Sequence, residues 1–267
     1  MRELLIKFFS EGSSEIEITL FSIWHILYIV LIVGAAIGLG IYLRKKNRFT
    51  QDKVLSAIAV AIPVIYIADF FIMPLARSSF DIDIDKLPFH VCTLMGILVP
   101  FVHFNKRFEK LKTPVTCLGL VASLMYITYP GSALGGLAPW CYKIVQTFLY
   151  HGFLLIYGYV SIATDKVKLE FKNIYKELLL IMFVIVWASF GNNVYSNSEH
   201  HYDWFFVTGS TFPFVPAPLM PFVVLICVFA MCSIIYGINY GVRKLIERKN
   251  YSNKAYNNEE EKETSTI

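Results

Sequence analysis

Charged residues are scarce in this 267-residue chain, and they are almost absent from its long apolar stretches. Lys, Arg, Asp and Glu make up 16% of the residues, whereas apolar residues make up 56%. Of the 20 acidic residues, only Asp69 falls inside one of the apolar stretches. Because soluble domains carry roughly a quarter charged residues, this composition excludes an ordinary soluble fold.

Common signatures of soluble enzymes and of secreted proteins are also missing. The five cysteines form no C-x-x-C or other paired metal spacing, and no P-loop, G-x-S-x-G or H-E-x-x-H motif occurs. The first 20 residues are rich in Glu, which is the wrong order for a cleavable signal peptide. His200 and His201 are adjacent in a polar segment, where histidines are more often solvated than bound to metal. We therefore predict no metal and no cofactor.

Seven apolar stretches run along the chain, each about as long as a bilayer-spanning helix requires. Their ranges are 21–43, 54–74, 87–104, 114–130, 140–161, 178–196 and 218–242. They predict an all-α, polytopic integral membrane bundle of seven transmembrane helices. We expect three parts: a short extracytoplasmic N-terminal segment at 1–20, a transmembrane domain at 21–242, and a polar cytoplasmic tail at 243–267 that is disordered.

Positive charge is concentrated in every second gap between these stretches. Of the 24 Lys and Arg residues, 19 fall in the first, third and fifth gaps and in the tail. The other five are Arg2, Lys7, Arg77, Lys86 and Lys143. Because basic loops remain in the cytoplasm, the pattern predicts a multi-pass protein of the cell membrane with its N-terminus outside and its C-terminus inside. The net charge of +4 then reflects topology, and we predict no nucleic-acid partner.

Polar side chains inside the predicted spans gather in the outer half of the bundle. Asp69 lies near the outer end of the second span, and Cys92 lies roughly 7 Å below the outer start of the third. His151 lies about 16 Å deep in the fifth span, and Asn192 and Asn193 end the sixth. We expect nothing comparable in the inner half. Each residue alone also has an ordinary structural interpretation, such as a helix-to-helix hydrogen bond or a small apolar filler, and Cys92 could pair with Cys141.

Together these residues would support nucleophilic chemistry. A thiol reacts as the thiolate, which requires a nearby base or cation. His151 is the better candidate for that base, because His90 lies only two residues from Cys92 and faces another side of a regular helix. Asp69 would orient a histidine, and an Asn amide would stabilise a developing oxyanion.

Three short motifs resemble a known family. Leu87-Pro88-Phe89-His90-Val91-Cys92 resembles the L-P-x-H-x-C motif of the YwaF-type bacterial integral membrane proteins. Tyr150-His151-Gly152 is similar to the His-Gly of their fifth span, and Asn192-Asn193-Val194-Tyr195 to the Asn-x-x-Tyr end of their sixth. Thr93 departs from the acidic residue expected after the Cys.

The resemblance extends to eukaryotic transmembrane acyltransferases that act on ether lysophospholipids. It implies that Cys92 carries the acyl group and that His151 is the base. We predict that His90, Asn192, Asn193 and Tyr195 bind the substrate. We therefore predict a membrane-embedded, lipid-modifying enzyme, a Cys/His acyltransferase or a lipid hydrolase, whose partners are membrane lipids. The alternatives are a small-solute or ion transporter, which Pro63 within the second span favours, and a heptahelical binding or sensing protein. The sequence does not set the oligomeric state.

Overall fold

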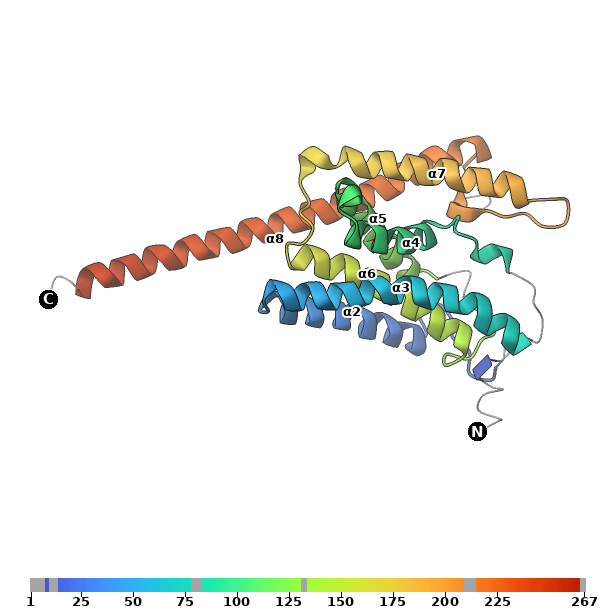
Figure 1. Cartoon of the computed structure of the whole chain (residues 1–267), viewed down its shortest axis with the longest axis horizontal. Coiled ribbons are helices and arrows are strands. Elements are labelled where there is room, and N and C mark those ends of the chain that lie inside the picture. The colour runs from blue at the N-terminus through green and yellow to red at the C-terminus, as the bar shows by residue number, and fades with distance from the viewer. Residues whose placement is uncertain (1–7, 10–13, 78–82, 131–133, 209–214, 265–267) are drawn as a thin grey trace.

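The computed structural model describes residues 8–9, 14–77, 83–130, 134–208 and 215–264 (Figure 1). All regular structure in these ranges is helical, so the predicted all-α class is confirmed. Most of the predicted N-terminal segment at 1–20 lies outside the described residues. The seven long helices are α2 (Ile23–Arg44), α3 (Arg48–Arg77), α4 (Val91–Phe104), α5 (Glu109–Thr128), α6 (Tyr142–Ala163), α7 (Tyr175–Tyr195) and α8 (Met220–Thr264).

These helices follow the seven apolar stretches in order. Five of the helical stretches are long and apolar enough to cross a membrane: Ile23–Arg44, Arg48–Pro74, Lys106–Thr128, Phe171–Tyr195 and Ala217–Lys249. Helix α4 is apolar but has only 14 residues, which gives a length of about 21 Å against the roughly 30 Å of a bilayer core. Helix α6 has 22 residues but carries more polar side chains.

Helix α5 lies at the centre of the bundle and contacts α4, α6, α7 and α8. Its side chains Val115, Cys117, Leu118 and Val121 are fully buried. Helix α6 forms a second hub, since it contacts α2, α3, α4 and α5. Large apolar side chains on the outer helices are exposed instead, as in Val30, Val64 and Ile226. Apolar residues on both the inside and the outside of a bundle are typical of helices that face lipid.

The two ends of the bundle differ in chemistry. At the end where α3 and α7 begin, on the left in Figure 1, Lys166 pairs with Asp52, Arg243 pairs with Asp165, and the Arg48 guanidinium donates to the carbonyl of Thr164 over 2.9 Å. We call this the basic end. These contacts join three of the predicted cytoplasmic segments, so the structure places those segments on one side.

The opposite end carries paired aromatic side chains, and we call it the aromatic end. The rings of Trp24 and Trp140 meet edge to face with centroids 6.1 Å apart. The indole of Trp204, in the short 3-10 helix η4 (Trp204–Phe206), donates to the carbonyl of Asp85 over 3.3 Å. Tryptophan at a bundle end is typical of a membrane interface.

Helix α8 continues well beyond the bundle. It runs without interruption from Met220 to Thr264, and its C-terminal part projects from the basic end in Figure 1. The predicted boundary between transmembrane domain and tail, at 242, falls inside this helix. The division of the chain into three parts stays a prediction.

Candidate functional site

The segment before α4 is fixed by aromatic packing against α7. The ring of Phe89 stacks on that of Trp187 at 5.1 Å and packs on Trp204 at 4.8 Å. The Trp187 indole donates to the carbonyl of Pro88 over 2.8 Å. A Cβ at Gly191 would lie 2.5 Å from Phe89 Cγ, so only glycine lets the ring approach α7 this closely. These contacts set the point at which α4 begins.

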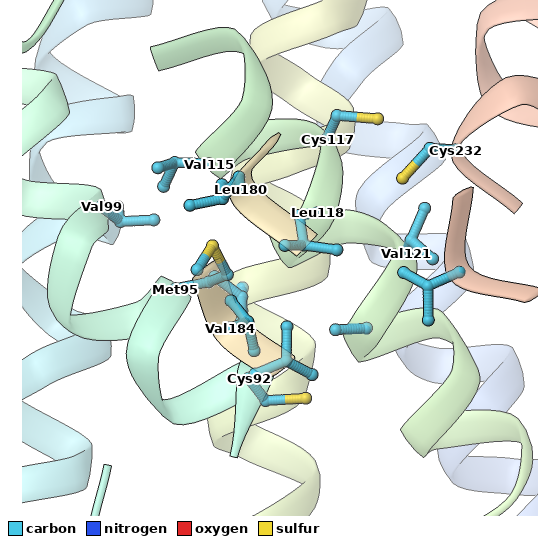
Figure 2. Close-up of a cluster of buried hydrophobic side chains, with 14 of the residues drawn as sticks. Cys92, Met95, Val99, Val115, Cys117, Leu118, Val121, Leu180, Val184 and Cys232 are labelled. Carbon is cyan, nitrogen blue, oxygen red and sulfur yellow. The ribbon is translucent and has the colours of Figure 1, made fainter. Parts of the chain in front are cut away.

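Cys92 is the second residue of α4. It is 7% exposed, and its side chain belongs to an apolar cluster that includes Met95 and Val184 (Figure 2). His90 is the N-cap residue and makes no side-chain capping bond, while the Cys92 thiol interacts with its own backbone N–H. The backbone N–H groups in the first turn of a helix lack intrahelical acceptors and carry partial positive charge. The helix start favours a thiolate, but the apolar surroundings of the buried side chain oppose any charge, so Cys92 rests as the thiol and needs a base to ionise.

Tyr150 joins Cys92 to helix α6. Its hydroxyl donates a hydrogen bond to the backbone carbonyl of Cys92 over 3.0 Å. The hydroxyl fits over Gly96, where a Cβ would lie 2.0 Å from it. Tyr150 directly precedes His151, so this bond ties the start of α4 to the turn of α6 that carries the predicted base.

The surroundings of His151 determine which ring nitrogen carries the proton. Its Nδ1 lies 2.8 Å from the carbonyl oxygen of Thr147, and because a carbonyl only accepts, Nδ1 carries the proton. In the neutral ring, Nε2 is then the acceptor, and no hydrogen bond to a described residue engages it. The ring stacks on Tyr126 with centroids 3.8 Å apart and 5° between the planes, and it lies within electrostatic reach of His90. The imidazole is therefore held in one orientation.

Asp69 is buried, but its partners are not histidines. Its carboxylate pairs with the ammonium of Lys86 and accepts from the hydroxyl of Tyr142. The Tyr66 hydroxyl donates to the Lys86 carbonyl over 2.5 Å. The group that orients His151 is thus the Thr147 carbonyl, and the role predicted for Asp69 in catalysis stays a prediction.

The two asparagines at the end of α7 differ. The Asn192 amide, which is 2% exposed, accepts from the backbone N–H of Trp204 over 2.8 Å and donates to its carbonyl over 3.3 Å. Asn193 is exposed and donates to the carbonyl of Ser189 in its own helix. Tyr195 packs on Phe89 and Trp204. Asn192 and Tyr195 therefore support the segment that precedes Cys92.

Two features of the site were not found by sequence reasoning. Cys92 lies in the first turn of α4, because the regular helix begins only after Leu87-Pro88-Phe89-His90; Pro88 was the available signal. The orienting carbonyl of Thr147 carries no sequence signal. The five cysteines are free thiols in the structure, and Cys141 belongs to a different apolar cluster from Cys92.

The expectation that the inner half contains no comparable polar group is wrong. Glu177, in the first turn of α7 near the basic end, is 0% exposed and accepts a hydrogen bond from the hydroxyl of Tyr236. The apolar stretch was taken to begin at 178, and Lys172 and Lys176 made residue 177 look like part of a charged loop. The helix begins at Tyr175 and turns Glu177 inward.

The comparison with protein families settles the membership of the chain. Residues 20–242, which include all the site residues above, match the TMEM164 family. The chain belongs to this family. No curated protein and no solved structure matches the chain. With its apolar helices, this TMEM164-family chain is a membrane protein; the resemblance to YwaF-type proteins and to lipid acyltransferases stays a prediction.

Proposed function

We propose that this protein is a membrane-embedded lipid-modifying enzyme that uses Cys92 as nucleophile and His151 as base. The observation that supports it best is the Tyr150 hydrogen bond, which ties the Cys92 backbone at the start of α4 to the helix turn that holds His151. Leu87–Cys92 and Tyr150–Gly152 resemble motifs of YwaF-type proteins, and the related lipid acyltransferases have a Cys in the third span and a later His. This resemblance points to the same pair. We prefer acyl transfer between lipids, with hydrolysis as the variant in which water is the acceptor.

In the first step, His151 Nε2 takes the proton from the Cys92 thiol. The thiolate attacks the ester carbonyl carbon of a donor lipid, and the backbone N–H groups at the start of α4 face the developing oxyanion. The C–O bond of the ester breaks, and the imidazolium returns the proton to the departing lysolipid alcohol. The product is an acyl thioester on Cys92.

In the second step, an acceptor lysolipid enters. His151 takes the proton of its hydroxyl, the oxygen attacks the thioester carbonyl, and the C–S bond breaks. The proton then passes to the departing Cys92 sulfur, which regenerates the thiol. No metal or redox cofactor is required for this sequence.

The surroundings of Cys92 suit a lipid substrate. Its side chain lies among apolar residues that include Met95 and Val184, surroundings that match the chemistry of an acyl chain and offer a solute few polar contacts. We further propose that all seven long helices cross the membrane, with the basic end cytoplasmic, so that the reaction takes place in the outer leaflet.

The test is acyl loading of the purified full-length protein. Incubation with a phospholipid that carries a deuterated acyl chain is expected to produce a thioester on the peptide containing Cys92. Neutral hydroxylamine should remove the label, because it cleaves thioesters far faster than oxygen esters. Cys92→Ala should abolish the adduct, and the control Cys141→Ala, in the other apolar cluster, should retain it. Equal loading of the Cys92→Ala protein would contradict the proposal.

The transporter and sensing alternatives stay predictions. A transporter would move its solute without a covalent adduct, and its flux would survive Cys92→Ala. Solute flux into proteoliposomes that contain the wild-type or the Cys92→Ala protein therefore separates a transporter from an enzyme.

A further inference from the structure

Glu177 is a fully enclosed carboxyl group in the half of the bundle opposite Cys92. It is 0% exposed and lies within Phe171–Tyr195, one of the stretches long and apolar enough to cross a membrane. Ionisable residues in such stretches are costly and tend to have a function. The mechanism proposed for Cys92 does not use this group.

The side chain that hydrogen-bonds to Glu177 is neutral, and so are the two thiols buried nearby. The Tyr236 hydroxyl of α8 donates to Oε1, while Oε2 is buried without a hydrogen-bond partner among the described residues. Tyr236 is 0% exposed, as are Cys117 of α5 and Cys232 of α8. The two thiols interact with one another, and Figure 2 shows their sulfur atoms at one end of the apolar cluster and Cys92 at the other.

The nearby cations are engaged elsewhere. Lys176 precedes Glu177 on the same helix, and its ammonium lies 6.0 Å from the ring centroid of Tyr175. Arg243, farther along α8, pairs with Asp165 and donates to Asn239. Within the described part of the chain, no Lys, Arg or His forms an ion pair with the Glu177 carboxyl group.

An ionised carboxylate here would be a buried charge without an ion-pair partner. Four features favour the ionised form: the hydrogen bond from Tyr236, the contact of the carboxyl group with its own backbone N–H, the partial positive charge at the start of α7, and the charge of Lys176. Together they are weaker than the cost of burying the charge. The protonated carboxyl group, with its proton on Oε2, is therefore the stable form at this buried position.

We infer that Glu177 is a proton-binding site, with Oε2 carrying the proton and Tyr236 holding Oε1. The proton exchanges with the basic end, since Glu177 is only the third residue of α7. Release of the proton leaves a charge between α7 and α8, so occupancy of the site is coupled to the packing of α8 on the bundle. This inference does not rest on the enzyme proposal.

The first test is carbodiimide labelling of the full-length protein in lipid nanodiscs. Dicyclohexylcarbodiimide adds to a protonated carboxyl group in an apolar environment, and the O-acylisourea rearranges to a stable N-acylurea without a leaving group. We expect a mass-spectrometric adduct on Glu177 that decreases as pH rises. Glu177→Gln should remove it. The control Glu170→Gln, an exposed residue paired with Lys172, should leave it unchanged.

Infrared spectroscopy decides the matter independently of reagent access. The wild-type protein at neutral pH should show the carbonyl band of a protonated carboxylic acid, and Glu177→Gln should lose that band while Glu170→Gln retains it. Tyr236→Phe removes the donor to Oε1 and should shift loss of the band to higher pH by about one unit. If the spectra of the wild-type and Glu177→Gln proteins differed only in carboxylate bands, the inference would be overturned.

Discussion

The hydroxyl of Tyr150 donates a hydrogen bond to the backbone carbonyl of Cys92 over 3.0 Å, and in doing so it lies over Gly96. The bond joins the first turn of α4 to α6 at the residue before His151. Gly96 leaves the space that this bond requires, so the relative position of Cys92 and His151 depends on Gly96 as well.

Gly96→Ala is expected to destabilise the protein, because its Cβ would lie 2.0 Å from the Tyr150 hydroxyl and Tyr150 is 5% exposed. Overpacking of this kind costs about 1–3 kcal/mol. The control is Gly34→Ala, since a Cβ at Gly34 meets nothing within 4 Å and alanine favours a helix by about 1 kcal/mol. Thermal unfolding in detergent should rank Gly96→Ala below wild type and Gly34→Ala at or above it. The reverse order would show that α4 and α6 are not packed as described.

Asn192→Ala is expected to cost about 2 kcal/mol or more, because it leaves the buried N–H and carbonyl of Trp204 without partners. It should also loosen Phe89, which packs on Trp204 ahead of Cys92. The neighbouring Asn193→Ala, at an exposed position, should change stability by about 0.5 kcal/mol or less. Denaturation of the two variants side by side measures the difference in stability. Equal effects would argue against the two hydrogen bonds between the Asn192 amide and the Trp204 backbone.

A topological prediction follows from the two ends of the bundle. The basic end, where Arg48, Lys166 and Arg243 make their contacts, should face the cytoplasm. A reporter fused after Lys249 should then be cytoplasmic, and one inserted after Glu199 should be external. Reporters found on the same side would contradict an odd number of crossings between the two insertion points.

The sequence predicted the order and number of the long helices, because seven apolar stretches alternate with polar gaps. It placed the start of the third helix too early, at 87, whereas α4 begins at Val91. Proline disfavours the helical conformation in the residue before it, so Pro88 keeps Leu87 out of the helix, and Phe89 is held by its packing on Trp187 and Trp204.

The candidate site was only partly predictable. Cys92 and His151 stand out as polar residues in apolar stretches, but the partners of each group come from distant segments. Lys86, which pairs with Asp69, lies in a gap between stretches, and Thr147 acts through its backbone. Glu177 was missed because Lys172 and Lys176 make its part of the sequence resemble a charged loop. Hydropathy identifies which residues enter a bundle, while their partners depend on packing.

The reactivity of Cys92 tests the central claim most directly. Under the proposed function, the resting thiol reacts with a small, membrane-permeant alkylating agent near neutral pH because His151 accepts its proton. We expect His151→Ala to slow alkylation of Cys92 by roughly 100-fold or more, as is typical when a general base is lost. Cys141→Ala should leave the rate unchanged. Alkylation that is equally fast without His151, or that occurs only after reduction of a disulfide, would contradict the account.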